Sequence, residues 1–185
     1  ISWVDVNNDE FLDLFTASRN NQPNALYVND KNGGFEKLTK GAIVEDLEDT
    51  RACTWDDFDN DGDQDLYVGN ADLPNSVYIN EGNLSFTKST TGIQLDKDYT
   101  YGVSAQDINS DGFIDLFTSN LYQPNVLQIN NGDGTFTKIT EGEIVKDEGH
   151  SKGIVWQDFD NDGDLDLFVS NGTPGSVEDH FFLSQ

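Results

Sequence analysis

Apolar and polar residues follow one another in the same order four times along the chain. Each unit opens with a short apolar stretch, and these stretches end at Trp3, Trp55, Ala105 and Trp156. A loop rich in Asp and Asn follows, and then a continuous apolar run at 14–15, 66–68, 116–117 and 167–169. Unbroken apolarity over so few residues predicts a strand that is buried on both of its faces.

Two more strands are predicted in each unit. A turn comes first, and it contains Pro23-Asn24, Pro74-Asn75, Pro124-Asn125 and, in the fourth unit, Pro174-Gly175. A third strand is predicted at 26–29, 77–80 and 127–130, and glycine-containing turns then lead into a fourth strand that opens at Phe35, Phe86 and Phe136. No segment shows a helical period. Four antiparallel strands per repeated unit predict an all-β fold, a β-propeller of four-stranded antiparallel blades.

The units divide the chain into repeats of approximately 1–49, 50–99, 100–149 and 150–185 within a single propeller segment. The fourth repeat is incomplete, and we interpret Ser176–His180 as an insertion before its third strand. We therefore expect about 3.7 blades of a larger propeller, of about seven blades, whose remaining blades or domains belong to the same polypeptide.

The polar loop of each unit is a nonapeptide: DVNNDEFLD from Asp5, DFDNDGDQD from Asp57, DINSDGFID from Asp107 and DFDNDGDLD from Asp158. Their starts lie 52, 50 and 51 residues apart. Side-chain oxygens at positions 1, 3, 5 and 9 of a tight loop can converge on one cation, joined by the backbone carbonyl of position 7. The predicted ligands are Asp5, Asn7, Asp9, Phe11 and Asp13; Asp57, Asp59, Asp61, Asp63 and Asp65; Asp107, Asn109, Asp111, Phe113 and Asp115; and Asp158, Asp160, Asp162, Asp164 and Asp166.

Calcium suits such an oxygen cage better than magnesium, which keeps several waters. The EF-hand and dockerin-type loops are excluded, because position 12 would have to be acidic and is Thr16, Val68, Thr118 and Val169. The remaining alternative is a solvated acidic turn without an ion, and four copies in register argue against it. We expect three to four Ca²⁺ ions.

The four loops are not equivalent. Position 6 needs a conformation that glycine adopts readily, and Gly62, Gly112 and Gly163 occupy it in three loops. Glu10 stands there in the first loop, at a cost of about 1 kcal/mol if its φ is positive. The first loop is therefore predicted to bind most weakly, and the second and fourth, with Asp at position 3, to bind most tightly.

The formal net charge is −25, from 35 acidic and 10 basic residues. Such a charge excludes nucleic acid and anionic membrane surfaces as partners, and no membrane insertion is expected. The single cysteine, Cys53, excludes an intrachain disulfide framework.

The motif D-x-D/N-x-D-G-x-x-D, followed by an L-F/Y-V/T run, N-x-L-Y-x-N and G-x-F-T, resembles the FG-GAP or VCBS repeat family, found in integrin α-subunit heads and many secreted bacterial proteins. The resemblance covers the whole chain. It implies that the acidic loop joins the first and second strands of a blade and binds calcium through the residues at positions 1, 3, 5 and 9 named above. Glu10 is the one clear departure from the motif.

Calcium in these hairpin loops is expected to be structural. A partner would then bind at the opposite end of the strands, in the loops before each first strand and between each second and third strand. Candidate ligand-binding residues on these loops are Arg19, Arg51, Tyr99, Tyr101, Tyr122 and His150. Aromatic and charged side chains of this kind suit a glycan or protein ligand.

The sequence thus predicts a calcium-binding module, secreted or on the cell surface, of a bacterial source, that mediates adhesion or binds an extracellular protein or glycan. No catalytic constellation is present, so we expect no enzymatic activity. Two alternatives stay open: the propeller portion of a secreted polysaccharide-degrading lyase or hydrolase with catalytic residues elsewhere, and a structural spacer of a large surface protein.

Overall fold

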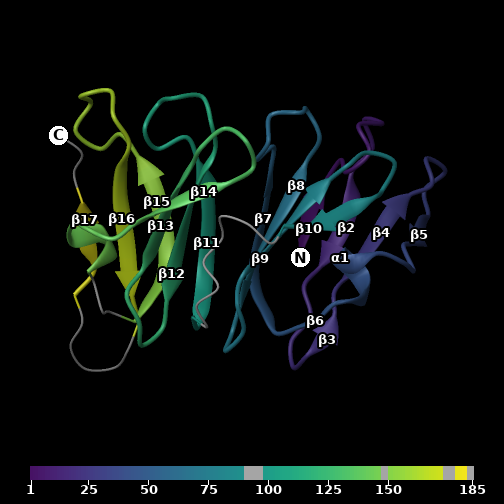
Figure 1. The fold of residues 1–185 in the computed structure, drawn as a ribbon, viewed down its shortest axis with the longest axis horizontal. Helices are drawn as coiled ribbons and strands as arrows, with labels where there is room; N and C mark the ends of the chain where they lie inside the picture. The colour runs from purple at the N-terminus through teal and green to yellow at the C-terminus, as the bar shows by residue number, and fades with distance from the viewer. Residues whose placement is uncertain (90–97, 147–149, 173–177, 183–185) are drawn as a thin grey trace.

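The computed structural model describes residues 1–89, 98–146, 150–172 and 178–182. The described strands form three four-stranded antiparallel sheets, one three-stranded sheet and one small two-stranded sheet. The first four stand side by side in chain order as propeller blades (Figure 1). Their strands are β1 (Ser2–Val4), β2 (Asp13–Thr16), β4 (Ala25–Asn29) and β5 (Phe35–Lys37); β7 (Thr50–Asp56), β8 (Asp65–Asn70), β9 (Ser76–Asn80) and β10 (Phe86–Lys88); β11 (Thr100–Gln106), β12 (Asp115–Asn120), β13 (Val126–Asn130) and β14 (Phe136–Ile139); and β15 (Ser151–Gln157), β16 (Asp166–Asn171) and β17 (His180–Phe182). The predicted all-β class and blade architecture are confirmed.

The second strand of each sheet is the best buried, as its apolar run predicts. All six residues of β8 and of β12 are buried. Side chains alternate between the two faces of a strand. Leu66 accordingly packs with Phe15 of the first sheet, whereas Tyr67 packs with Leu116 of the third. The hydrophobic cores therefore lie between the sheets.

The first strands of neighbouring sheets approach one another closely, with β11 between β7 and β15. A Cβ atom built on Gly102 of β11 would lie 2.8 Å from the backbone oxygen of Lys152 in β15. Only glycine fits at this contact without a shift of the backbone.

Single helical turns occur in two of the connections between sheets, although no helical period was expected. They are α1 (Ala42–Glu45) and the 3₁₀ turn η1 (Glu143–Val145). Each begins after a glycine with positive φ and buries one or two apolar side chains. Three or four residues are too few to give a periodic pattern in the sequence.

A small two-stranded sheet joins the connection between the first two sheets to the connection between β2 and β4. Strand β3 (Gln22–Pro23) is antiparallel to β6 (Leu47–Glu48). Single bridges between Ala71 and Tyr99 and between Leu121 and His150 join the corresponding segments of the later sheets.

Buried amides link each sheet to the next. Asn75, in the turn after β8, donates its side-chain N–H to Thr100 Oγ1 at 3.0 Å. Its Oδ1 accepts the backbone N–H of Asn70 at 2.8 Å. The same bond between sheets recurs in the pairs Asn24–Thr50 and Asn125–Ser151. We call these three contacts the interblade amide bonds.

The fourth sheet makes this turn with different residues. The backbone N–H of Asn171 donates to Asp179 Oδ1 and its side-chain amide to the carbonyl of Glu178, both at 2.8 Å. In the third sheet Asn120 makes the same two bonds to the Pro124-Asn125 turn.

Glu178-Asp179 is therefore the equivalent of the Pro-Asn turn, and the assignment of that role to Pro174-Gly175 is wrong. The insertion predicted at Ser176–His180 is also wrong in its extent, because Asp179 belongs to the turn and His180 begins β17. Three more residues separate Asn171 from Asp179 than separate Asn120 from Asn125 (8 against 5). Pro174 and Gly175 themselves lie outside the described residues.

Replacing Asn75 with alanine is expected to lower the free energy of unfolding by about 2 to 4 kcal/mol, because the N–H of Asn70 and the hydroxyl of Thr100 both lose a buried partner. Chemical denaturation measures this change. The exposed Thr87→Ala variant on β10 serves as control and should stay within about 0.5 kcal/mol of the wild type. Equal stability of the two variants would remove the energetic role given to the interblade amide bonds.

Candidate functional site

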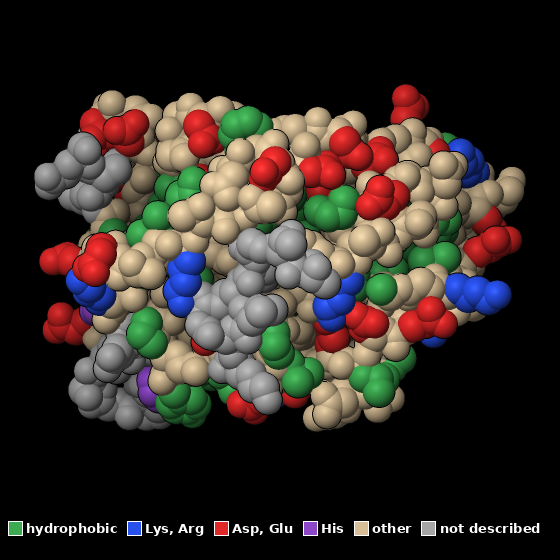
Figure 2. Space-filling view, in the orientation of Figure 1, with side chains coloured by type: hydrophobic (Ala, Val, Ile, Leu, Met, Phe, Trp, Pro, Cys, Tyr) green, Lys and Arg blue, Asp and Glu red, His purple; other side chains and the backbone are tan. Residues whose placement is uncertain are grey.

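The four acidic loops lie at the same edge of the row of sheets, where each first strand turns into its second strand (Figure 1). They occupy the β1–β2, β7–β8, β11–β12 and β15–β16 connections. Acidic side chains gather along this upper edge in Figure 2. The repeat thus brings four clusters of carboxylates onto one side of the molecule.

All four loops have the same backbone shape. Position 4 is left-handed in each, with φ of 55° at Asn8, 61° at Asn60, 59° at Ser110 and 63° at Asn161. Position 6 is left-handed as well, in the three glycines and in Glu10, whose φ is 71°. The strain expected at Glu10 is confirmed, because a non-glycine residue is disfavoured in this region.

The first aspartate of each loop holds this shape. Asp57 accepts the backbone N–H of Asp61 on Oδ1 at 3.1 Å and that of Gly62 on Oδ2 at 2.9 Å. Asp5, Asp107 and Asp158 accept the equivalent pairs of N–H groups. The fifth residue does the same on a smaller scale, since Asp61 Oδ1 accepts the N–H of Asp63 at 2.9 Å.

The ninth aspartate connects the loop to the third strand. Asp65 is fully buried and accepts the N–H of Phe58 at 2.9 Å and that of Asn80, at the end of β9, at 2.7 Å. Burial raises the pKa of Asp65 to about 7, against the lowering effect of these two hydrogen bonds. Burial likewise raises the pKa of Asp13 and of Asp115. A nearby positive charge would relieve this cost of burying the carboxylate.

The third residue carries an acceptor without a partner in two loops. Asn7 Oδ1 and Asp59 Oδ1 are buried and accept no hydrogen bond. Burial raises the pKa of Asp59, and the charges of Asp61, Asp57 and Glu81 raise it further. Buried polar atoms in proteins normally have a hydrogen-bonding or ionic partner. These two oxygens are therefore candidates to bind a cation.

Two of the loops gather three carboxylates with ligand oxygens within 4.8 Å of one another: Asp57, Asp59 and Asp61 in the second, and Asp158, Asp160 and Asp166 in the fourth. Oxygen donors at this spacing fit a hard divalent cation. In the third loop the carboxamide of Asn109 takes position 3, and its amide group donates to Asp111 Oδ2 at 2.9 Å.

A lysine reaches the first loop. Lys31 Nζ lies 3.1 Å from Asp9 Oδ2 and 5.6 Å from the centre of the Phe11 ring. Desolvation raises the pKa of Asp9, but the bonds from Lys31 and from the N–H of Phe11 outweigh it, so that the pKa is lowered. The first loop therefore has a partner for its carboxylate within the chain.

The contact of Lys31 with the first loop was not predicted from the sequence, although alignment of the repeats shows a lysine where two other repeats have glycine. The backbone N–H of Lys31 donates to the preceding strand-end asparagine, as do those of Gly82 and Gly132 in the next two sheets. Lys31 thus stands at a left-handed position, with φ of 61°, where the other repeats have glycine. In the third sheet a Cβ at Gly132 would lie 2.5 Å from Phe113, so that repeat leaves no room for such a side chain.

Aromatic and basic residues gather at the opposite end of the strands. The Arg51 guanidinium lies 5.2 Å from the centre of the Tyr99 ring, and Tyr99 lies 6.4 Å from Tyr122. Tyr122 in turn contacts the His150 ring at 4.4 Å between centroids. The structure thus brings four of the six predicted ligand-binding residues into one row across three sheets, which we call the aromatic row.

The other two candidates lie beside the row or apart from it. Tyr101 is 41% exposed and has Lys152 Nζ at 5.7 Å from its ring centre. Arg19 is exposed in the connection after β2 and is not part of the ring contacts. Lys152 was not predicted, but it occupies the same repeat position as Tyr101.

β-Bulges position the basic and aromatic side chains next to the row. The pairing of the first and second strands shifts register between Thr50 and Ala52, Thr100 and Gly102, and Ser151 and Gly153. The residue skipped in each case is Arg51, Tyr101 and Lys152. A bulge of this kind re-aims the side chain of the extra residue. Histidine and hydrophobic side chains are visible along this lower edge in Figure 2.

Among the residues that the structure describes, none belongs to a helix with the length and apolarity needed to cross a membrane.

Comparison with known proteins identifies the repeat. The sequence model of the FG-GAP-like repeat matches residues 5–68, 57–118 and 107–169. Each match begins at one acidic loop and ends in the strand that follows the next acidic loop. Among solved structures, the chain is similar to part of a mutant Tc holotoxin pore of Photorhabdus luminescens, with a TM-score of 0.53 and 18% sequence identity. That match covers 92% of this chain and 8% of the toxin chain, and at this identity it shows a common fold alone. No curated protein sequence matches. Three overlapping matches from residue 5 to residue 169 show that the chain belongs to the FG-GAP-like repeat family.

Proposed function

We propose that the chain is a calcium-binding extracellular β-propeller module in which the acidic loops hold structural calcium and the opposite face binds a ligand in adhesion. The observation that carries the calcium assignment is the buried, partnerless Asp59 Oδ1 within a loop whose three carboxylates converge to within 4.8 Å. The same backbone shape in all four loops extends the assignment to the array.

Calcium fits these loops for three reasons. The donors are all oxygens, calcium accepts the irregular coordination geometry that such a loop offers, and the carboxylate at position 9 is buried where its charge needs compensation. In the second loop Asp57, Asp59, Asp61 and Asp65 would hold the ion together with the carbonyl of Asp63. The bound ion would neutralise the carboxylates, whereas the hydrogen bonds of Asp57 and Asp61 hold the loop backbone and those of Asp65 hold the third strand.

The ligands reach beyond their own loop, which is why the ion would be structural. Asp65 fixes Asn80 at the end of β9, and Asn80 Nδ2 donates to the carbonyl of Val6 in the preceding loop at 2.9 Å. Asn130 makes the same bond to the carbonyl of Phe58 at 2.9 Å. Neutralising one loop therefore stabilises the contact between two sheets.

An extracellular location follows from the proposed calcium. Loops of this kind, without the rigid cage of a high-affinity cytosolic buffer, suit the higher calcium concentrations outside cells. We propose a secreted or cell-surface protein on this basis, and a binding module in preference to an enzyme.

The aromatic row supports a glycan as the ligand. Tyr122 is 70% exposed, and flat exposed rings stack on the apolar faces of sugars. Arg51 lies in the row and Lys152 beside it, in a chain of net charge −25, and Arg51 also pairs with Asp49 at 3.4 Å. Two basic side chains here favour sugars that carry carboxylates over neutral ones. A protein ligand would be distinguished by the binding experiment below.

Removing calcium is expected to lower the melting temperature. Each site with free calcium at a hundredfold excess over Kd stabilises the folded state by about 2.7 kcal/mol. Differential scanning calorimetry with calcium and with excess chelator measures the shift. Isothermal titration should show a larger loss of calcium affinity for Asp61→Ala than for Asp9→Ala, with Asp133→Ala in a turn outside the loops as control. An unchanged melting temperature in chelator contradicts structural calcium.

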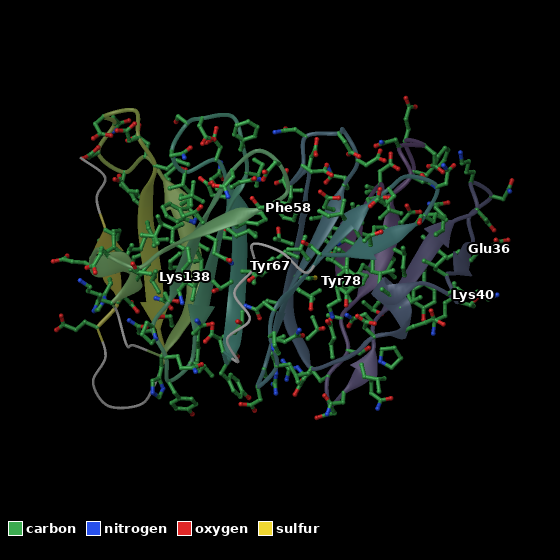
Figure 3. The ribbon with its side chains drawn as sticks, viewed as in Figure 1. Glu36, Lys40, Phe58, Tyr67, Tyr78 and Lys138 are labelled. Carbon is green, nitrogen blue, oxygen red and sulfur yellow. The ribbon has the colours of Figure 1, made fainter. Side chains whose placement is uncertain are left out.

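Replacing Lys31 with glycine is expected to strengthen calcium binding to the first loop by up to about fivefold. The change removes a competing cation from Asp9, and the effect is small because an exposed ion pair is weak in water. It also places glycine at a left-handed position. Calcium titration measures the affinity, and Lys40→Ala, at a site away from the loops in Figure 3, removes the same charge as control. Unchanged or weaker binding in Lys31→Gly would contradict the competition.

Tyr122→Ala and Tyr99→Ala are each expected to weaken glycan binding by about 5-fold to 150-fold, because each ring contributes about 1 to 3 kcal/mol through stacking and burial. A glycan array probed with and without calcium identifies the sugar, and titration of the best hit gives the affinities. Tyr27→Ala is the matched control, since Tyr27 carries Lys37 at 5.8 Å from its ring, much like the Tyr101–Lys152 pair. Equal losses in the control, or binding only to protein ligands, would sink the glycan assignment.

A further inference from the structure

Asparagine is followed directly by glycine at three places in the chain, Asn32-Gly33, Asn131-Gly132 and Asn171-Gly172. In such a pair the backbone nitrogen of the glycine can attack the side-chain carbonyl carbon of the asparagine, because glycine has no side chain that blocks the approach. The reaction requires that this nitrogen and this side chain are not held by other groups. The three pairs differ in that respect.

The first pair lies at the tip of the turn between β4 and β5 (Figure 1). Asn32 and Gly33 are both exposed. Asp30 Oδ1 accepts the backbone N–H groups of Asn32 and Gly34, each at 2.8 Å. The N–H of Gly33, which lies between them, donates to no group among the described residues. The attacking nitrogen of this pair is therefore free.

The space around the first pair is open as well. Gly33 has a φ of 92°, and a Cβ atom built on it would meet nothing within 4 Å. The side chain of Asn32 makes one hydrogen bond, from Nδ2 to the carbonyl of Asp30 at 2.8 Å. Its Oδ1, on which negative charge develops during the attack, accepts no bond from the residues that the structure describes and can be solvated by water.

The second pair is held at every reacting group. The N–H of Gly132 donates to Asn130 Oδ1 at 2.9 Å. Asn131 Nδ2 donates to Thr135 Oγ1 and Asn131 Oδ1 accepts the hydroxyl of Thr137, both at 2.9 Å. Attack at Asn131 therefore requires that the turn between β13 and β14 first opens.

The third pair is held in a similar way by groups from other parts of the chain. The N–H of Gly172 donates to the carbonyl of His150 at 3.1 Å. Asn171 Nδ2 donates to the carbonyl of Glu178 at 2.8 Å, and its Oδ1 accepts the hydroxyl of Ser151 at 3.1 Å. Attack at Asn171 would break the contact between the third connection and the fourth sheet.

We propose that Asn32 is a site of selective spontaneous modification, at which the folded chain converts asparagine into aspartate and isoaspartate with time. The Gly33 nitrogen forms a bond to Cγ of Asn32, the bond between Cγ and Nδ2 breaks, and ammonia leaves with the proton of the Gly33 N–H. Water then opens the cyclic imide. Addition of water at Cγ gives aspartate, and addition at the main-chain carbonyl carbon gives isoaspartate. Water is the one co-reactant.

The fold accommodates the aspartate product. The turns of the first and third sheets have the same length and register, so Asn32 and Asp133 are equivalent. Asp133 accepts the N–H of Thr135 at 3.0 Å within its turn. An aspartate at position 32 therefore suits this turn.

Both products change the surroundings of the first acidic loop. Each adds a negative charge next to Lys31, whose ammonium group lies 3.1 Å from Asp9 Oδ2. Isoaspartate also lengthens the main chain of a turn that is closed by the bond from the N–H of Asp30 to the carbonyl of Gly34, at 3.0 Å. The modification would thus act on the segment that carries Lys31.

The test is peptide mapping of the full chain by mass spectrometry after ageing in warm, mildly alkaline buffer. Digestion at mildly acidic pH avoids further reaction, and the gain in mass from exchange of NH₂ for OH is read for each pair separately. We expect Asn32 to react at least about tenfold faster than Asn131 or Asn171, because these two react only from opened states. In urea the three rates should become similar, since all three pairs are then exposed.

Two variants serve as controls. Asn32→Gln should remove most of the acidic species that ion-exchange chromatography resolves in the aged chain, because glutamine would have to close a larger ring. Asn32→Asp reproduces the aspartate product and should melt like the wild type. Reaction of Asn131 or Asn171 in the folded chain as fast as that of Asn32 would overturn the proposal. So would an Asn32 that reacts in urea but stays unmodified in the folded chain.

Discussion

The constraint on which the structure depends is that its sheets are apolar on both faces. A strand such as β8, with all six residues buried, cannot be stable in an isolated sheet, because one of its faces would always meet water. Each inner sheet therefore lies between two others, and the cores form in the spaces between sheets. Stability then resides in neighbouring pairs of sheets, as in other repeat proteins.

Hydrogen bonds at the two ends of the strands fix how these faces meet. At one end the interblade amide bonds join the turn of one sheet to the first strand of the next. At the other end the strand-end asparagines Asn80 and Asn130 reach the preceding acidic loop. Apolar contact alone would allow sheets to slide along one another, whereas polar bonds at both ends define one register. The acidic loops are part of this frame, because the ninth aspartate places the asparagine.

The sequence predicted what the repeat encodes locally and missed what depends on contacts across repeats. Four strands per unit, burial of the second strand and the left-handed position at Glu10 followed from pattern and loop chemistry. The turn of the fourth unit was misplaced because Pro174 was aligned with the prolines of the other repeats. The backbone N–H of Asn171 instead donates to Asp179, which takes the place of the turn asparagine. Lys31 was missed because its partner Asp9 lies 22 residues away, across a strand pair. The aromatic row could be named from the sequence, but its continuity needed the register of neighbouring sheets.

The Lys31–Asp9 pair makes the first loop of the chain different from the later ones. On the proposed calcium assignment, the first loop carries its own positive charge, whereas the second and fourth depend on an ion taken from the surroundings. A fall in external calcium would then loosen the later sheets while the first stays closed. Contacts made by the first sheet would then outlast those made by the second and fourth sheets.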